Sequence, residues 1–198
     1  MMSDSPSAPT APAVHDCLIV GAGFGGLCAA WRLQQAGRSD FLILDQADGV
    51  GGTWWWNRYP GIACDIPAHF YCFSFAPNPH WSSAYPPGSE IQAYLARFAE
   101  TSGFVPRLRL GRRVERFVFE EERACWRLET ASGEVFRARH VISAAGSLHE
   151  PKMLRLPGFD EFGGVQAHTA RWPDTLELAG KRVAVIGSAA SAIQTAPA

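Results

Sequence analysis

One stretch of the sequence, residues 17–45, constrains the fold more than any other. It begins with a short, wholly apolar run, residues 17–20, of the kind that a parallel strand covered on both faces needs. A glycine-rich turn, residues 21–26, follows directly, and apolar residues then recur at helical spacing. Residues 41–44 predict a second buried strand, which closes on Asp45. The order is therefore strand, glycine turn, helix, strand and acid.

This order predicts a βαβ unit that binds a dinucleotide. Gly21 permits the tight turn, Gly23 lets the backbone approach a pyrophosphate, and Gly26 lets the helix pack close to the strand. The pyrophosphate is expected at the helix N-terminus, against free N–H groups and the positive end of the helix dipole. Asp45 would accept hydrogen bonds from a ribose diol and repel a 2′-phosphate. The first site is therefore expected to hold FAD or NAD rather than NADP, and the predicted contacts are Gly21, Gly23, Phe24, Gly26 and Asp45.

Composition places the chain among ordinary globular proteins. It has 198 residues, 47% apolar and 19% charged, with a net charge of −1, which gives no argument for a nucleic-acid or membrane partner. Five arginines within residues 107–116 alternate with apolar residues and are expected on the solvated face of strands. The five cysteines lack metal-ligand spacing and indicate free thiols in a reducing compartment. Residues 1–13 indicate a disordered tail and not a signal peptide, so a cytoplasmic location is expected.

A tryptophan-rich stretch, residues 49–65, carries a resemblance to a known family. Gly51-Gly-Thr-Trp, Asn57-Arg-Tyr-Pro-Gly, Cys64-Asp65 and the following residues 66–75 resemble class B flavoprotein monooxygenases, and among them the Baeyer–Villiger type. In that family the segment wraps the isoalloxazine ring. The resemblance implies that Asp65 sits beside the flavin, where it can pair with a catalytic arginine. It also implies that the residues near FAD include Gly51, Gly52, Thr53, Trp54 and Trp56.

A second motif supports the same resemblance. Residues 162–173 fit FxGxxxHxxxWP, which marks Baeyer–Villiger monooxygenases and close relatives, and several of its fixed positions are of rare type. The resemblance implies that His168, with Asp65, belongs to the catalytic set. Its implied role is to couple cofactor binding to domain movement from a linker between two nucleotide domains, without transferring a proton.

Between these motifs the pattern predicts one helix and several strands. Residues 89–100 predict a helix with a capping box formed by Ser89 and Gln92. Residues 114–119, 125–129 and 135–138 alternate and predict an antiparallel meander inserted between Rossmann elements. An apolar strand then returns at residues 141–146, and the resemblance implies that its last residues, Ala145 and Gly146, are neighbours of FAD.

A second strand, glycine turn and helix begins near the end of the chain. Residues 183–186 predict a parallel strand, and Gly187 opens a turn where the resemblance implies that NADPH docks. The second and third glycine positions are Ala189 and Ala192. An alanine at the third position is usually accommodated, whereas a Cβ at Ala189 intrudes on the approach of a pyrophosphate.

The predicted fold class is α/β. A Rossmann-like FAD-binding domain, residues 14–160, combines a parallel sheet, helices and the inserted meander. A linker carrying the motif, residues 161–179, leads to the truncated start of an NADPH-binding domain, residues 180–198. No metal site is predicted.

The resemblance implies an enzyme that uses FAD, NADPH and O2 to insert one oxygen atom into a ketone through a C4a-peroxyflavin, giving an ester or lactone. Because the chain represents only the N-terminal part of such an enzyme, we expect it to be inactive alone. Two alternatives stay open. One is a flavin monooxygenase that hydroxylates nitrogen or sulfur, and the other is a non-catalytic flavin-binding remnant.

The glycine fingerprint leads to a first prediction. Replacing Gly23 by valine is expected to abolish retention of FAD, because the side chain would fill the space that a pyrophosphate needs. The far-UV circular dichroism is expected to stay largely intact. A Gly23→Val variant that purifies with stoichiometric flavin would contradict the fingerprint.

Overall fold

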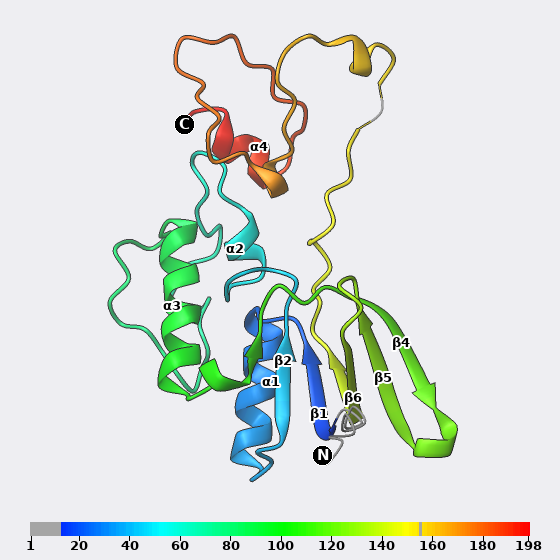
Figure 1. The fold of residues 1–198 in the computed structure, drawn as a ribbon. Coiled ribbons are helices and arrows are strands. Elements are labelled where there is room, and N and C mark those ends of the chain that lie inside the picture. The colour runs from blue at the N-terminus through cyan, green and yellow to red at the C-terminus, as the bar shows by residue number, and fades with distance from the viewer. Residues whose placement is uncertain (1–12, 155) are drawn as a thin grey trace, which may run out of the picture.

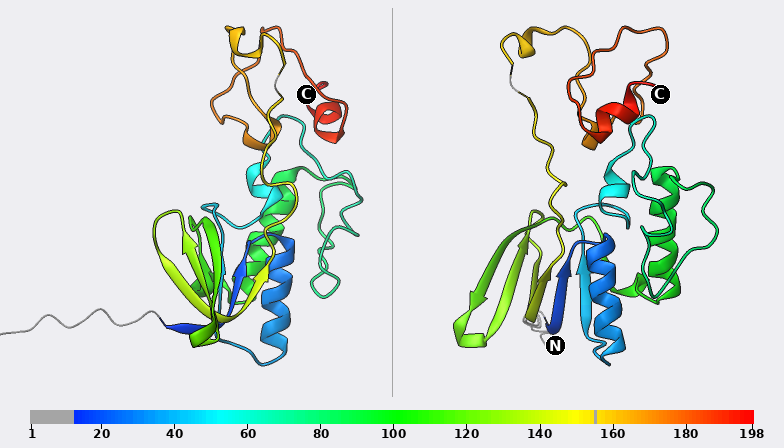
Figure 2. Two further views of the ribbon diagram at one scale, coloured as in Figure 1. Left: turned by 90° about the vertical axis from the view of Figure 1, so that its right-hand side faces the viewer. Right: turned by 180° about the vertical axis from the view of Figure 1, so that it is seen from behind.

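The computed structural model describes residues 13–154 and 156–198, and it has the predicted α/β fold (Figure 1). A six-stranded sheet has the order β3-β2-β1-β6-β5-β4. Two long helices pack against the face of the sheet that carries Ile19 and Ile43, as the two side views also indicate (Figure 2). The strands are β1 (Val14–Val20), β2 (Phe41–Leu44), β3 (Leu108–Arg109), β4 (Val114–Glu120), β5 (Cys125–Thr130) and β6 (Val135–Ser143), and the helices are α1 (Phe24–Gln35), α2 (Thr53–Trp56), α3 (Gly88–Thr101) and α4 (Ala190–Thr195).

Strand β1 lies at the centre of the sheet because both of its faces are apolar. Ile19 packs with Leu27 of α1 on one face, and Leu18 packs with Leu128 of β5 on the other. All four of these side chains are completely buried. Burying an aliphatic side chain of this size contributes about 1.5–3 kcal/mol, so the apolar run that predicted the strand also anchors the domain.

The predicted meander is present, but its last strand is continuous with the apolar strand that was predicted separately after it. Residues 135–138 and 141–143 belong to one strand, β6. Its first half pairs antiparallel with β5, and from Arg137 to Ser143 it pairs parallel with β1. Strand β6 therefore lies between β1 and β5 and pairs with one of them along each edge. The antiparallel hairpin of β4 and β5 therefore extends the parallel sheet at this edge.

Helix α3 has the predicted apolar stripe but not the predicted cap. Its stripe is buried, and Tyr94 also donates its hydroxyl hydrogen to the carbonyl oxygen of Ala76 at 2.8 Å. The N-cap residue is Pro87, and no side chain caps the helix. Gln92 instead donates its Nε2 hydrogen to the carbonyl of Val50 at 2.9 Å, so it ties α3 to the glycine-rich segment. The capping box predicted for Ser89 and Gln92 is therefore wrong, because Gln92 has a better acceptor on a neighbouring segment.

The tryptophan-rich stretch contains the short helix α2. One further prediction, the strand at residues 183–186, is wrong. Residues 183–186 form no strand, and Val183, Val185 and Ile186 are 52%, 43% and 62% exposed. Within the described residues no strand lies beside this segment to supply hydrogen-bond partners, and an isolated strand is not stable.

The last helix is nevertheless held on the domain. Gln194 of α4 accepts a hydrogen bond from the Tyr59 hydroxyl at 2.8 Å and donates one to the carbonyl of Ala63 at 2.9 Å. These contacts hold α4 above α2, as Figure 1 shows.

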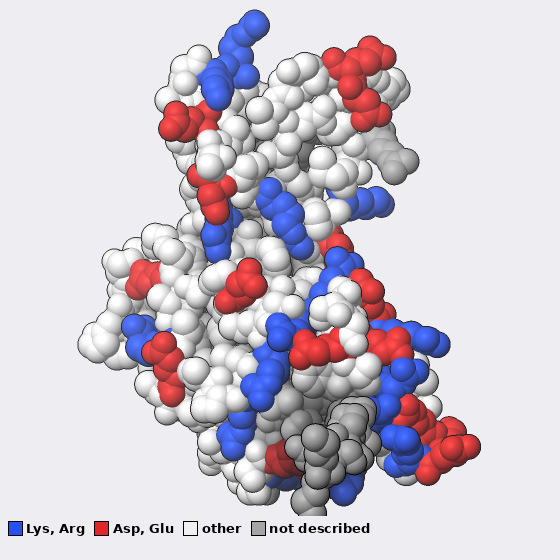
Figure 3. All heavy atoms as spheres, in the orientation of Figure 1, with Lys and Arg blue, Asp and Glu red and all other residues white. Residues whose placement is uncertain are grey.

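Surface charge and cysteines agree with the composition. Figure 3 shows lysine and arginine side chains interspersed with acids over the visible face. Arg112, Arg113 and Arg116 each pair with a glutamate, as expected for a solvated sheet face. All five cysteines are free. Within residues 13–154 and 156–198, no group of three metal-binding side chains is found, and none of the helices has the length and apolarity that a membrane crossing requires.

The packing of the first glycine turn gives a stability prediction. A Cβ on Gly26 would lie 1.7 Å from the carbonyl oxygen of Gly21, whereas a Cβ on Gly23 would have its nearest neighbour at 3.4 Å. Gly26→Ala is therefore expected to lower the free energy of unfolding by about 1–3 kcal/mol, because the backbone at Gly21 must move to make room for the new Cβ. Gly23→Ala serves as the control, and urea unfolding measures both. Equal stability of the two variants would contradict this packing.

Candidate functional site

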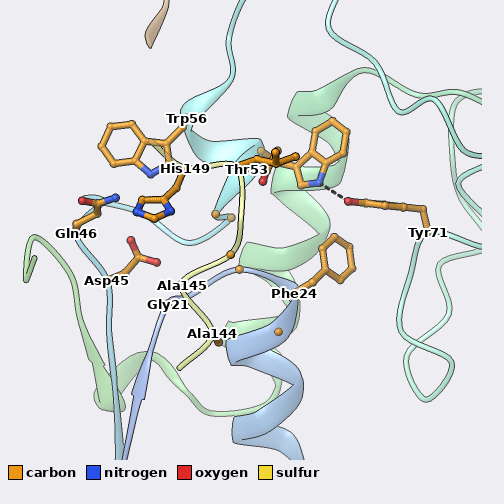
Figure 4. Close-up of a pocket in the computed structure, with 17 residues that line it drawn as sticks. Gly21, Phe24, Asp45, Gln46, Thr53, Trp56, Tyr71, Ala144, Ala145 and His149 are labelled. Carbon is orange, nitrogen blue, oxygen red and sulfur yellow. Dashed lines mark hydrogen bonds between the residues drawn. The ribbon is translucent and has the colours of Figure 1, made fainter. Parts of the chain in front are cut away.

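The main candidate site is a cavity of about 210 Å³ where β1 meets α1 (Figure 4). It gathers most of the predicted FAD contacts from four separate parts of the chain: the first glycine turn, the end of β2, the segment around α2, and the chain after β6. The predicted residues on its wall are Gly21, Gly23, Phe24, Asp45, Gly51, Gly52, Thr53, Trp54, Trp56, Ala145 and Gly146.

The floor of the cavity is backbone that leaves no room for side chains. Gly21 has a φ of +114°, and a Cβ there would lie 2.2 Å from the carbonyl oxygen of Ala144. Gly52 has a φ of +57°, and its Cβ would lie 3.0 Å from the Cα of Gly23. Gly23 is the N-cap of α1 and places no side chain over the first turn. The free N–H groups of a 12-residue helix thus face an open cradle, which suits a pyrophosphate.

Asp45 lies on the cavity wall and is fixed by two backbone bonds. Its Oδ2 accepts a hydrogen bond from the amide of Ala22 at 2.6 Å, and its Oδ1 accepts one from the amide of Ala47 at 2.8 Å. Only 7% of the residue is exposed, and burial raises the pKa of its carboxyl above the ordinary range in spite of these bonds. Because a carboxylate has about four acceptor positions, two remain for ribose hydroxyl groups.

The opposite end of the cavity is aromatic. Trp54 donates its indole hydrogen to the hydroxyl of Tyr71 at 3.3 Å, the bond drawn in Figure 4. The rings of Phe24 and Tyr71 meet edge to face with centroids 5.0 Å apart. Burial raises the pKa of the Tyr71 hydroxyl, so it stays protonated at neutral pH. Such a wall suits a planar, largely apolar ring and excludes water from it.

The sequence missed several residues of the cavity. Tyr71 lies within the quoted stretch 66–75, where its aromatic spacing could have marked it. His149 and Leu148 follow the end of β6, and Gln46 follows Asp45. The carboxyl ends of parallel strands line ligand sites in open α/β sheets, so position after a strand was the available signal.

Four predicted site residues, Gly26, Asp65, His168 and Gly187, lie outside this cavity. Gly26 supports it from below through its contact with Gly21. Asp65 lies on a second, adjoining cavity of about 420 Å³, which shares Thr53, Trp54, Tyr71 and Leu148 with the first. Gly187 lies on the wall of neither cavity.

His168 also lines the second cavity. Its Nδ1 accepts a hydrogen bond from the amide of Ala170 at 3.0 Å, so the ring caps a short 3₁₀ helix, Thr169–Arg171. The structure thus brings His168 and Asp65 to one cavity that adjoins the first.

The second glycine turn repeats the backbone of the first. Ala189 and Gly23 are both N-caps, with φ and ψ of −88° and 179° and of −87° and −165° respectively. The Cβ of Ala192 lies 3.7 Å from the Cβ position of Gly187, an ordinary contact. Alanine at the third position is therefore accommodated. At the second position, Ala189 carries a Cβ where Gly23 leaves space.

Comparisons with known proteins agree with this geometry. Residues 19–85 match the family model of the NAD(P)-binding Rossmann-like domain. A Baeyer–Villiger monooxygenase of Streptomyces coelicolor is 48% identical over 179 residues, which are 90% of this chain and 34% of the relative. The phenazine N-monooxygenase of Lysobacter antibioticus is 34% identical, again over 90% of this chain and 34% of the relative.

A solved structure gives the same result. Cyclohexanone monooxygenase from Rhodococcus sp. Phi1, bound to NADP+, superposes with a TM-score of 0.86 at 38% identity, over 93% of this chain and 36% of that one. The chain thus spans about a third of the length of the relatives that it matches, at their N-terminal part. The predicted fold class and the resemblance to Baeyer–Villiger monooxygenases are confirmed.

The environment of Asp45 predicts a pH dependence. Burial raises the pKa of this carboxyl in the folded chain, so its protonated form is favoured there and the folded state gains relative stability as the pH falls through the raised pKa. FAD affinity is expected to change in the opposite sense, because only the carboxylate accepts hydrogen bonds from two ribose hydroxyl groups.

The Asp45→Asn variant is expected to bind FAD about tenfold more weakly at neutral pH and to lose the acid dependence, because an amide offers one acceptor oxygen in place of two. Flavin fluorescence titrations between about pH 4 and pH 8 measure both effects. An unchanged affinity at neutral pH would exclude Asp45 from the site.

Proposed function

We propose that this chain, a homologue of the N-terminal third of Baeyer–Villiger monooxygenases, is the FAD-binding part of a flavin-dependent monooxygenase. The observation that carries the proposal is the first cavity. A cradle without side chains at the start of α1, the Asp45 carboxylate and an aromatic wall all line it. These are the three surfaces that a pyrophosphate, a ribose and a planar ring require.

Each surface has a distinct task in this proposal. The first turn of α1 holds the pyrophosphate through N–H groups and the positive end of the helix dipole. Asp45 accepts hydrogen bonds from the ribose of the adenosine half. Phe24, Trp54 and Tyr71 enclose the ring end and keep water from it.

Bound FAD would supply the redox chemistry, in which reducing equivalents from NADPH and one atom of O2 convert a ketone into an ester or lactone. The residues of this chain would bind FAD and shield its ring from water. Asp65 places a carboxylate in the adjoining cavity, where it can hold a cationic partner beside the ring, and His168 orders the motif segment on that cavity's wall. We assign NADPH to the turn at Gly187, with weak affinity because of the Cβ of Ala189.

Oxygenation of nitrogen is a second candidate function. The phenazine N-monooxygenase is 34% identical over 90% of this chain, the same share of the chain that the Baeyer–Villiger relative matches. The two reactions use the same pair of nucleotides, so the cofactor site does not distinguish them. The product does, since a cyclic ketone gives a lactone whereas the ring nitrogen of a phenazine gives an N-oxide.

The first test is reconstitution. Purified chain is mixed with FAD, desalted, and examined by visible absorption. Retention of a flavin spectrum is the expected result, because the whole first cavity forms within the described residues. A colourless protein would contradict the proposed site.

The second test adds NADPH, O2 and either a cyclic ketone or a phenazine to the flavin-loaded chain. We expect little or no NADPH oxidation by the 198-residue chain, because Gly187 lines neither cavity and residues 183–186 have no strand partner among the described residues. Rapid bleaching of the flavin by NADPH would show that this prediction is wrong, and mass spectrometry of the product would then separate the two candidate functions.

A further inference from the structure

Arg171 lies at an unassigned position of the FxGxxxHxxxWP segment, yet it makes the closest contacts between that segment and the first cavity. Its guanidinium carbon lies 4.2 Å from the centroid of the Trp56 ring. Its Nη2 donates a hydrogen bond to the carbonyl oxygen of His149 at 2.7 Å, and its Nη1 donates one to the carbonyl of Ala170, also at 2.7 Å. Trp56 and His149 both line the first cavity.

These two partners form one side of the cavity. Figure 4 shows Trp56 and His149 together, on the side that carries Asp45 and Gln46. They come from unconnected parts of the chain. Trp56 ends α2, and His149 lies in the irregular segment after β6. No hydrogen bond joins the two residues in the described part of the chain, whereas Arg171 contacts both of them.

Arg171 is suited to that task by its chemistry. A guanidinium is always charged, is planar, and can stack on an indole while it donates hydrogen bonds in its own plane. Among the described residues between His149 and Arg171, regular structure is limited to the 3₁₀ helix Phe159–Glu161 and to the one that Arg171 itself ends. The hydrogen bond to His149 therefore ties together the two ends of this loop.

We infer that Arg171 is a positioning residue that holds Trp56 and His149 in place as one wall of the nucleotide cavity, and so couples the motif segment to cofactor affinity. The effect on FAD rests on the proposed function, whereas the closure of the loop does not. Burial raises the pKa of the Asp45 carboxyl, and His149 acts against burial by lowering that pKa. Displacement of His149 would therefore disturb the ribose end of the site as well.

The chain offers a matched control. Arg58 likewise lies over an indole, that of Trp55, at 4.9 Å, and it pairs with Asp174 just after the motif. Neither Arg58 nor Trp55 lines the first cavity. Arg58→Gln therefore removes a cation–π contact and an ion pair near the same segment without touching the proposed wall.

The first experiment measures FAD affinity by flavin fluorescence for the wild-type chain, Arg171→Gln, Arg171→Lys and Arg58→Gln. Arg171→Gln is expected to raise the dissociation constant about tenfold, because one cation–π contact and one charged hydrogen bond are lost. Arg171→Lys keeps the charge and is expected to recover part of the affinity. Arg58→Gln is expected to match the wild type. Equal affinity of Arg171→Gln and wild type, or an equal loss in both glutamine variants, would overturn the inference.

A second readout does not require FAD. Lys152 lies in the loop that Arg171 closes and is exposed, so trypsin can cleave after it. Cleavage there, followed by mass spectrometry, is expected to be several-fold faster in Arg171→Gln than in Arg58→Gln or wild type. If the wild type binds no FAD, the proposed function fails and the cleavage rates alone decide the inference. Unchanged cleavage in Arg171→Gln would then overturn it.

Discussion

The close packing of the first glycine turn is the constraint on which the rest of the site depends. Gly21 leaves no space beside the carbonyl of Ala144, and Gly26 leaves none beside the carbonyl of Gly21. The end of β1, the start of α1 and the end of β6 therefore approach one another backbone to backbone at this junction. Because no side chain enters this junction, the N–H groups at the start of α1 remain available to a ligand. The same absence of side chains that makes the junction compact also makes it a binding site.

Around this junction the remaining parts of the site are tied by specific polar contacts. Asp45 bonds to the amide of Ala22 within the turn, and Gln92 ties α3 to the carbonyl of Val50 beside Gly51 and Gly52. Arg171 brings the distant motif segment to Trp56 and His149. The cavity is thus assembled in layers, with rigid backbone innermost and longer-range side-chain contacts outside. Variants in the outer layer are expected to tune affinity, whereas variants in the inner layer alter the fold.

The two glycine turns have similar backbone conformations but differ in the strand before them and the helix after them. Gly23 and Ala189 have nearly the same φ and ψ, and both begin a helix. The first turn is followed by a 12-residue helix packed on a complete sheet, whereas the second leads into the six residues of α4, held by Gln194 on the loop near Tyr59. Turn geometry is a local property, but a nucleotide site also needs the strand before the turn to be paired.

The sequence by itself determined the βαβ unit, the buried strands and the helix stripes, because glycine spacing and apolar periodicity act through local sterics and burial. The resemblance to the monooxygenase family added most of the residues of the first cavity. It could not determine that residues 135–143 form one strand with two partners, because strand pairing depends on which edges are free. Nor could it place Tyr71 and His149 on the cavity, or show that Gln92 turns away from its cap to Val50. Asp65 and His168 were singled out far apart in the sequence, and only the tertiary structure placed both on one adjoining cavity. Each of these contacts joins segments that are remote in the sequence. Such segments come close to each other only once the sheet and α3 have packed.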